Sequence, residues 1–284
     1  MARKNVGVFY HPVFKTQGYV TFRDRLRDFP GALNELLKQP HIKLYQCPRV
    51  SLDLLLKVHA REMIIRADLE DAGATAYESV GGVVAAMEAL ARGELERAFC
   101  FVGVGGHHAG SRDFFDDSCF NDVMVAVTHV RELSPWRRFA VVDTDAHHAG
   151  GTLELLGEDA EVLHLCFCRS NYQSLDGKAI EINVYRQEEQ ADSHSWYLDQ
   201  VRRHLPLVQE FSPELLIWYF GFDTHRDEAA SLGLTEETYF GICDLLTALA
   251  NKAGIPLLVV LGGGSLHYVA SAAIPEIIRR LGEG

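Results

Sequence analysis

Six short apolar runs, separated by longer stretches of mixed polarity, constrain the fold of this chain more than any other feature. The runs are VGVFY (6–10), AFCFVGV (98–104), FAVVD (139–143), EVLHLCF (161–167), LLIWYF (215–220) and PLLVVL (256–261). Continuous apolar strands of this kind are typical of a parallel sheet buried on both faces. No proline-rich linker or internal repeat divides the chain. We therefore expect residues 1–284 to form one α/β domain.

Two helices are predicted between these runs. Ala74–Arg92 has helical character although it contains Gly81 and Gly82, each of which costs about 1 kcal/mol relative to alanine. We expect a close contact of this helix to be the reason for both glycines. A second helix is predicted to begin after Thr235 as N-cap and to end at Gly254, directly before Ile255-Pro256.

The charge balance limits the classes of partner. The chain has 27 basic and 39 acidic residues, a formal net charge of −12, which argues against nucleic acid or an anionic membrane surface. A neutral or cationic small molecule is the expected partner. The first apolar run is too short for a signal peptide or a membrane span, and the six cysteines contain no CxxC pair. We expect a cytoplasmic protein with reduced thiols.

Polar segments follow four of the predicted strands, at the point where each strand ends. In open α/β sheets, ligands bind beyond the carboxyl ends of the strands, so we expect these segments to meet at one edge. They are GGHHAG (105–110), DTDAHH (143–148), GFDTHRDE (221–228) and GGGSLHY (262–268).

The segment DTDAHH has the spacing of a metal site. Side chains of an extended segment alternate between two faces, so Asp143, Asp145 and His147 point to one side. Asp145 and His147 can then bind one cation, and Asp223 from another strand end supplies a third ligand. Three N/O ligands with an open position suit catalytic zinc or ferrous iron. An isolated Asp or His at a strand end is more often a turn former, so the prediction depends on the whole constellation.

The neighbouring segments fit the same interpretation. Beside a metal, His107 and His108 would act as a base toward bound water and as an acid toward a leaving amine, and Asp143 could orient one of these imidazoles. Glycines 262–264 lack the lysine of a phosphate-binding loop, so close backbone approach at a pocket is the better explanation for them. The sequence contains no GxSxG motif, so a covalent mechanism with a serine nucleophile is not indicated.

These motifs, in this order along nearly the whole chain, resemble the histone deacetylase and acetylpolyamine amidohydrolase superfamily. The resemblance is carried by LLLKVHAREMI (54–64), YESVGGVVAAM (77–87), VGGHHAG (104–110), VVDTDAHHAGGT (141–152), PELLIWYFGFDTH (213–225) and LGGGS (261–265). It implies a single α/β domain with a mostly parallel sheet of about eight strands, a fold shared with arginases.

The resemblance also implies a reaction. By position, Asp145, His147 and Asp223 match the family's zinc ligands, His107 and His108 its histidine pair, and Asp143 the aspartate that partners the first histidine. The expected activity is metal-dependent hydrolysis of an N-acyl amide in a small substrate, with Zn²⁺ or Fe²⁺ and a structural K⁺ near Asp143. Histones are not the expected substrate, and the oligomeric state, including a homo-oligomer, stays open.

Three departures from the family pattern bear on activity. The family's catalytic tyrosine follows its glycine-rich loop, where this chain has Ser265 and Leu266; the candidates to replace it are His267 and Tyr268. Loss of such a donor typically costs about 100- to 1000-fold in rate. The Asp or Asn expected to support the second histidine is also absent, because Ala149, Gly150 and Gly151 follow His148.

The third departure is FFDDSCFND (114–122), in place of the family's Gly-Phe-Cys segment. Asp116 and Asp117 would bring negative charge near an acyl channel and suit a cationic substrate, or they are solvated loop carboxylates. Phe114, Phe115 and Phe120 either form a wall of that channel or anchor the loop.

Two other functions remain open at this point. A metal-binding but catalytically weak relative with a binding or regulatory role is favoured by the missing tyrosine and the missing Asp or Asn. An arginase-like ureohydrolase needs two metals bridged by several aspartates. After His147 the chain has His148 and small residues instead of a further carboxylate, which disfavours that reading.

Overall fold

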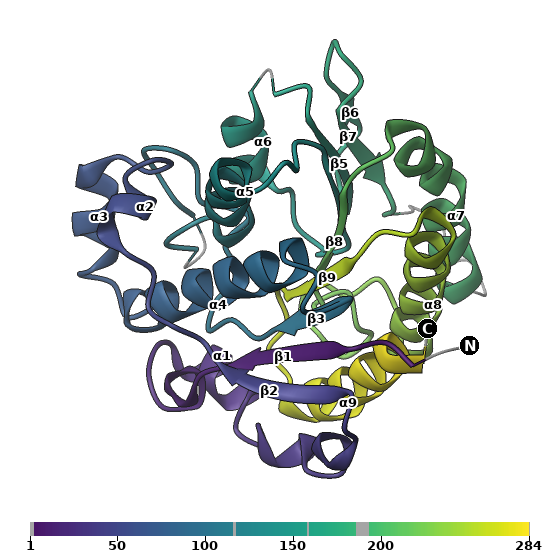
Figure 1. The fold of residues 1–284 in the computed structure, drawn as a ribbon, viewed down its shortest axis with the longest axis horizontal. Helices are drawn as coiled ribbons and strands as arrows, with labels where there is room; N and C mark the ends of the chain where they lie inside the picture. The colour runs from purple at the N-terminus through teal and green to yellow at the C-terminus, as the bar shows by residue number, and fades with distance from the viewer. Residues whose placement is uncertain (1–2, 116–117, 158, 186–192, 284) are drawn as a thin grey trace.

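A central, mostly parallel sheet organises the chain, as the apolar runs predict. The computed structural model describes residues 3–115, 118–157, 159–185 and 193–283. Its nine-stranded sheet has the order β2-β1-β3-β9-β8-β4-β5-β7-β6, and all neighbouring strands are parallel except β6 and β7 (Figure 1). The strands are β1 Val6–Tyr10, β2 Ile42–Gln46, β3 Arg97–Cys100, β4 Phe139–Asp143, β5 Val162–Cys168, β6 Tyr172–Gln173, β7 Ala179–Asn183, β8 Leu215–Phe220 and β9 Leu257–Leu261.

Each of the six apolar runs forms a strand, and the other three strands lie at or near the two edges of the sheet. The edge strand β2 is exposed along most of its length, β6 has two residues, and β7 mixes buried with half-buried positions. Strands with an exposed side do not need a continuous apolar run, so the sequence carries only a weak signal for them.

Two layers of helices cover the sheet. Helices α4 and α5 pack on one face, and α7, α8 and α9 pack on the other (Figure 1). The helices are α1 Val20–Arg25, α2 Leu52–Leu55, α3 Arg61–Ala67, α4 Gly73–Ala91, α5 Asp122–Leu133, α6 Gly150–Leu156, α7 Ser193–Phe211, α8 Glu236–Ala253 and α9 His267–Glu283, with short 3-10 turns at Pro12–Lys15, Gly31–Leu33 and Leu36–Lys38. None of these helices is long and apolar enough to cross a membrane.

Both predicted helices are present, and the glycines of α4 have a steric explanation. A Cβ added at Gly81 would lie 1.9 Å from the carbonyl oxygen of Pro48, and one at Gly82 would lie 2.4 Å from Cys47 Sγ. The segment that leaves β2 therefore runs directly against the helix, and no side chain fits between them. Helix α8 has Thr235 at its N-cap, and Gly254 ends it in the left-handed conformation that favours glycine.

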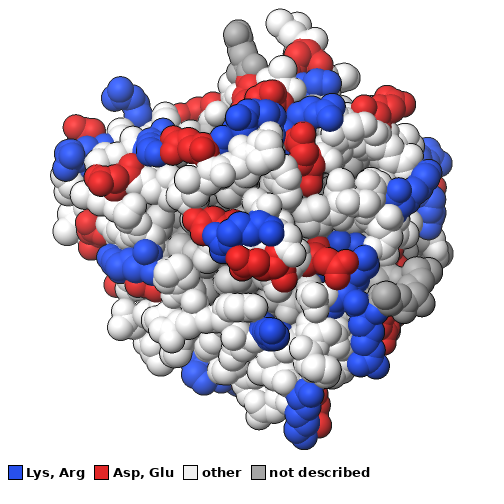
Figure 2. Space-filling model, in the orientation of Figure 1, with Lys and Arg blue, Asp and Glu red and all other residues white. Residues whose placement is uncertain are grey.

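The two termini meet on one side of the molecule, where the backbone N–H of Lys4 donates to the carbonyl of Gly282 (Figure 1). Acidic and basic side chains are interspersed on the face seen in Figure 2. The net charge of −12 is therefore not gathered into one acidic patch on that face.

Candidate active site

Four neighbouring strands carry the polar segments singled out in the sequence. The sheet places β3, β9, β8 and β4 side by side, and all four are parallel. Their carboxyl ends therefore lie at one edge, where the segments after them line a cavity of about 570 Å³. Its lining includes His107, His108, Asp145, His147, Asp223 and Gly263.

Asp145, His147 and Asp223 come together at this edge, with ligand atoms within 4.8 Å of one another. His147 Nδ1 lies 3.0 Å from Asp145 Oδ1 and 2.8 Å from Asp223 Oδ2. Both carboxylates are buried, whereas the imidazole is half exposed on the cavity side. The structure thus places the three predicted metal ligands around one point.

Backbone N–H groups hold the two carboxylates in place. Asp145 Oδ2 accepts from the N–H of Gly263 at 2.6 Å, and Asp223 Oδ1 accepts from the N–H of Ala146 at 3.1 Å. Asp223 Oδ2 is buried and accepts no well-directed hydrogen bond from the described residues, despite its 2.8 Å approach to His147. A buried carboxylate oxygen in need of a partner, beside a second carboxylate and an imidazole, fits a divalent cation.

The glycine-rich loop reaches these carboxylates because it has no side chains. A Cβ at Gly263 would lie 2.6 Å from Asp145 Oδ2 and 2.9 Å from Asp223 Oδ2. At Gly221, two residues before Asp223, a Cβ would meet Asp145 Cα at 2.6 Å. Close backbone approach therefore explains glycine at both positions.

The electrostatics of the cluster reflect its excess of negative charge. Burial and the neighbouring Asp145 raise the pKa of Asp223 to about 7. Close polar contacts with Asp145 and Asp223 raise the pKa of His147 to about 10. Burial opposes ionisation of Asp145, but His107 and His147 outweigh it and lower the pKa of that carboxyl. Two carboxylates forced together in this way favour a cation between them.

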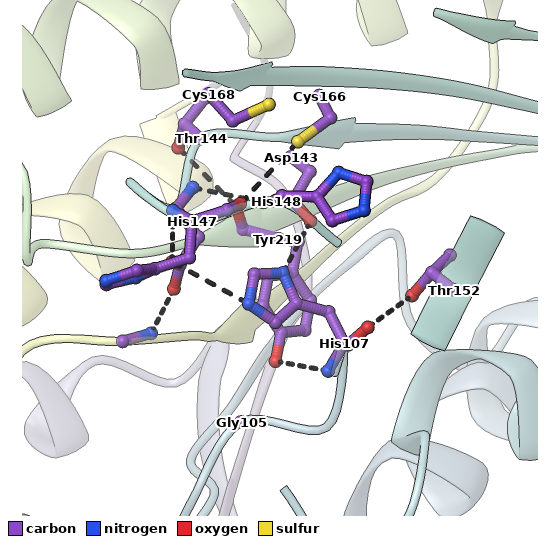
Figure 3. A network of polar contacts seen from close by, with 12 residues as sticks. Gly105, His107, Asp143, Thr144, His147, His148, Thr152, Cys166, Cys168 and Tyr219 are labelled. Carbon is purple, nitrogen blue, oxygen red and sulfur yellow. Dashed lines mark hydrogen bonds and ion pairs between the residues drawn. The ribbon is translucent and has the colours of Figure 1, made fainter. Parts of the chain in front are cut away.

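His107 is held on two sides (Figure 3). Its Nδ1 lies 2.9 Å from Asp143 Oδ2, and its ring stacks on Tyr219 with centroids 4.8 Å apart and planes inclined by 16°. Burial acts to lower the pKa of His107, but Asp145 and Asp143 outweigh it and raise that pKa to about 9. Asp143 is thus the partner of the first histidine, and it also accepts from the N–H of Asp145 at 3.0 Å.

His108 lies between the other two imidazoles of the cavity. Its ring centroid is 4.2 Å from that of His107 and 6.0 Å from that of His147. His148, the next residue along, turns away from this group and contacts the buried carboxylate of Glu181 on β7. The structure therefore pairs His148 itself with a carboxylate.

The structure does not bring His267 or Tyr268 into the cavity. His267 begins α9 and contacts Arg27, while the Tyr268 hydroxyl donates to Asp227 at 2.9 Å on a side chain that is 46% exposed. Leu266, which precedes His267, is fixed by the hydrogen bond of its N–H to Glu228 at 2.8 Å. Among the described residues of the cavity wall, Tyr219 is the tyrosine, and its hydroxyl accepts from the N–H of His107 at 3.3 Å.

The segment predicted to wall a channel is only partly described. Asp116 and Asp117 lie outside the described residues. Phe120 is buried against Tyr77, Phe114 lies beneath the guanidinium of Arg66, and Phe115 is 65% exposed. None of the three lines the main cavity, whose lining includes Phe22 instead.

Several residues at or near the site were not singled out by the sequence analysis, because they lie outside its motifs. Tyr219 lies inside the apolar run LLIWYF, where an aromatic residue looks like ordinary core. His164 and Glu181 could have been identified from the sequence, because each places a titratable group inside an otherwise apolar strand. His164 is fully buried, with Nε2 3.7 Å from Asp143 Oδ2. Arg25 is fully buried too and donates to the carbonyls of Gly262 and Gly264 at 2.7 and 2.9 Å.

Comparison with known proteins gives consistent matches. The sequence model of the histone deacetylase domain matches residues 66–281. The type-2 histone deacetylase 2 of Dictyostelium discoideum is 29% identical over 203 residues, which are 62% of this chain and 12% of that protein. A probable deacetylase of Archaeoglobus fulgidus is 25% identical over 283 residues, 89% of this chain and 77% of that protein.

A solved structure shows the same fold. The crystal structure of the HDA15 HD domain superimposes with a TM-score of 0.84, covering 98% of this chain and 89% of that chain at 22% sequence identity. The chain spans only 12% to 37% of the length of the curated relatives matched in Dictyostelium discoideum and Arabidopsis thaliana.

Proposed function

Because the chain belongs to the histone deacetylase family of hydrolases, we propose that it cleaves an N-acyl amide, and in particular an N-acetyl amide, of a small amine-type substrate. The convergence of Asp145, His147 and Asp223 at the cavity, next to the His107–Asp143 pair, is the observation that carries this proposal. Asp145, His147, Asp223 and His107 line the cavity, and Asp143 contacts His107 from the buried side.

In this proposal Asp145, His147 and Asp223 hold a divalent ion, with Zn²⁺ preferred and Fe²⁺ as the alternative. Such an ion, when bound, lowers the pKa of a coordinated water toward about 7 and polarises the amide carbonyl. The Gly263 and Ala146 N–H groups keep the two carboxylates oriented toward the ligand position. A structural K⁺ near Asp143 and neighbouring carbonyls is part of the same proposal.

The histidine pair moves the protons. Asp143 accepts the hydrogen of His107 Nδ1, which leaves the Nε2 side of that ring facing Asp145 and the reacting centre. His108, beside it in the cavity wall, lies between His107 and His147. One of these imidazoles accepts a proton from water, and the pair returns a proton to the nitrogen of the departing amine.

A specific observation supports a second candidate, a metal-binding relative with weak turnover. Tyr268 donates to Asp227 outside the cavity, and Leu266 stands directly after Ser265 at the end of the glycine-rich loop. Neither His267 nor Tyr268 then supplies a donor to the developing oxyanion, and the loss of such a donor costs about 100- to 1000-fold in rate. Such a protein would bind acylated ligands more readily than it would cleave them.

Single-turnover measurements distinguish the hydrolase from the metal-binding relative with weak turnover. Protein in molar excess, loaded in turn with Zn²⁺, Fe²⁺ and Co²⁺, is mixed with acetylated polyamines, acetylated lysine and N-acetyl amino acids, and released acetate is quantified. The hydrolase proposal expects release with at least one ion and none from Asp145→Asn. Binding of an acylated ligand without release under any loading would favour the weak relative.

A further inference from the structure

A second cluster of ligand-type side chains lies behind the Asp145–His147–Asp223 site. It consists of His148 from the loop after β4, Cys168 at the end of β5 and Glu181 on β7. His148 Nδ1 contacts Glu181 Oε1, and Cys168 Sγ lies 3.8 Å from the same oxygen. One ligand atom from each residue lies within 4.8 Å of the others. Figure 3 shows Cys168 beside the segment that carries His147 and His148.

We propose that His148, Cys168 and Glu181 bind a second divalent ion, separate from the one held by Asp145, His147 and Asp223. A mixed nitrogen, sulfur and oxygen set suits Zn²⁺ and its close substitutes such as Co²⁺, whereas Ca²⁺ and Mg²⁺ require oxygen ligands. The proposal goes beyond hydrolysis at the first site, because none of these three side chains takes part in it.

The spacing of the atoms fits a tetrahedral ion. Metal bonds of about 2.0 to 2.3 Å at tetrahedral angles separate ligand atoms by about 3.3 to 3.8 Å. The 3.8 Å between Cys168 Sγ and Glu181 Oε1 matches that spacing. Only the half-exposed His148 has to turn, because its Nδ1 now touches the carboxylate oxygen that would share the ion with it.

Charge and burial support the same assignment. The Glu181 side chain is 3% exposed and Cys168 is fully buried, so a carboxylate and a thiol sit side by side away from water. A buried carboxylate is costly unless its charge is compensated. A thiolate and a carboxylate together neutralise a divalent cation, and the neutral imidazole of His148 adds no charge. The loaded cluster would therefore be electrically neutral in a buried place.

The position of the cluster gives the ion a structural consequence. Cys166 Sγ, two residues from Cys168 on the same face of β5, donates to the carbonyl of His147 at 3.7 Å. An ion on His148, Cys168 and Glu181 would tie β5 and β7 to the loop that carries the first-site ligand His147. His148 itself is half exposed and also lines the main cavity, so the cluster is in reach of solvent on that side.

Metal counting on folded, chelator-stripped and reloaded protein tests the proposal. Wild type is expected to retain two Co²⁺ or Zn²⁺ ions per chain after gel filtration. Cys168→Ser and Glu181→Gln should retain one, and Asp223→Asn should also retain one because only the first site is lost. The Co²⁺ form of wild type and of Asp223→Asn should show a thiolate-to-cobalt charge-transfer band, which Cys168→Ser loses.

Cys166→Ser is the matched control, since it removes the neighbouring thiol of the same strand and should keep both ions and the band. One ion per folded wild-type chain without a charge-transfer band would overturn the second site. So would a band that survives Cys168→Ser or disappears in Cys166→Ser. Loss of both ions in Asp223→Asn would indicate a bridged pair instead of two separate sites. The wild-type band is a readout even if a variant fails to fold, and none of these readouts depends on hydrolysis.

Discussion

His107 and Tyr219 lie face to face, with ring centroids 4.8 Å apart, and the tyrosine hydroxyl accepts a hydrogen bond from the His107 backbone N–H. The stacked ring fixes the plane of the imidazole, while Asp143 fixes its rotation. We therefore predict that Tyr219 acts by positioning the histidine.

The two contributions of Tyr219 can be separated by substitution. Tyr219→Phe should lower the free energy of unfolding by about 1 kcal/mol, the value of one hydrogen bond, and leave turnover close to wild type. Tyr219→Ala should cost about 3 to 5 kcal/mol and lower kcat more than it raises KM, because His107 loses its support. Denaturant unfolding and steady-state kinetics measure these effects. A Tyr219→Phe variant as inactive as Tyr219→Ala would contradict a purely positioning role.

Tyr268 serves as a test of where the oxyanion donor is. Because its hydroxyl bonds Asp227 on the surface, Tyr268→Phe should leave the single-turnover rate of acetate release unchanged. The loss of a true donor would lower that rate about 100- to 1000-fold. A fall of that size would mean that the start of α9 rearranges when substrate binds.

Arg25 should be a main determinant of the glycine-rich loop's stability. Its guanidinium donates to the carbonyls of Gly262, Gly264 and Val102 from a fully buried position, where burial lowers its pKa to about 10. Arg25→Met leaves these carbonyls without donors and should lower the free energy of unfolding by about 3 kcal/mol or more. Arg25→Lys keeps the charge but cannot span three carbonyls, so its loss should be intermediate. Equal unfolding midpoints for wild type and Arg25→Met would contradict this assignment.

Ion binding at the first site should reverse the stability order of wild type and Asp223→Asn. Without a divalent ion, Asp223→Asn removes the repulsion from Asp145 and should be the more stable protein. With Zn²⁺ at about 100 times its Kd, wild type should gain about 2.7 kcal/mol, whereas Asp223→Asn gains little from this site. Thermal unfolding with and without chelator, in a Cys168→Ser background that silences the second proposed site, measures the crossing. Parallel gains in both proteins would argue against Asp223 as a ligand.

Asp122 should make the fold less stable as pH rises. Burial raises its pKa to about 7, above the value of about 3.9 in an unfolded chain. Between these two values the folded protein binds more protons than the unfolded chain, so the free energy of unfolding falls from about pH 4 to pH 7. The full effect is on the order of a few kcal/mol. Urea unfolding of wild type and Asp122→Asn should give similar free energies of unfolding near pH 4, with a difference in favour of the amide variant that grows toward pH 7, because the amide resembles the protonated carboxyl. A constant difference would contradict the raised pKa.

Buried strands of the centre could be predicted from sequence because both of their faces must be apolar, and the six runs show this directly. Strand β2 escaped prediction for the opposite reason: an edge strand with exposed residues such as Leu44 and Tyr45 has no such pattern. The sheet order is also hidden, since nothing in a local stretch indicates that β8 and β9 lie between β3 and β4.

The convergence of Asp145, His147 and Asp223 could be predicted because the first two alternate on one strand end and the third follows another. The sequence could not predict contacts between residues far apart in the chain when one partner lies in a segment without a motif. The pairing of His148 with Glu181 is one example, and the departure of Tyr268 from the cavity is another. The latter depends on where α9 starts, because that start turns the side chains after Leu266 away from the glycine-rich loop.

The placement of β8 and β9 between β3 and β4 also sets an order of events during synthesis. A polypeptide synthesised only as far as residue 210 contains His107, Asp145 and His147, but neither Asp223 nor Gly263. Strands β8 and β9 must therefore be inserted between strands that were synthesised earlier. An ion that required Asp223 as a ligand could therefore be bound only after these last strands had been synthesised.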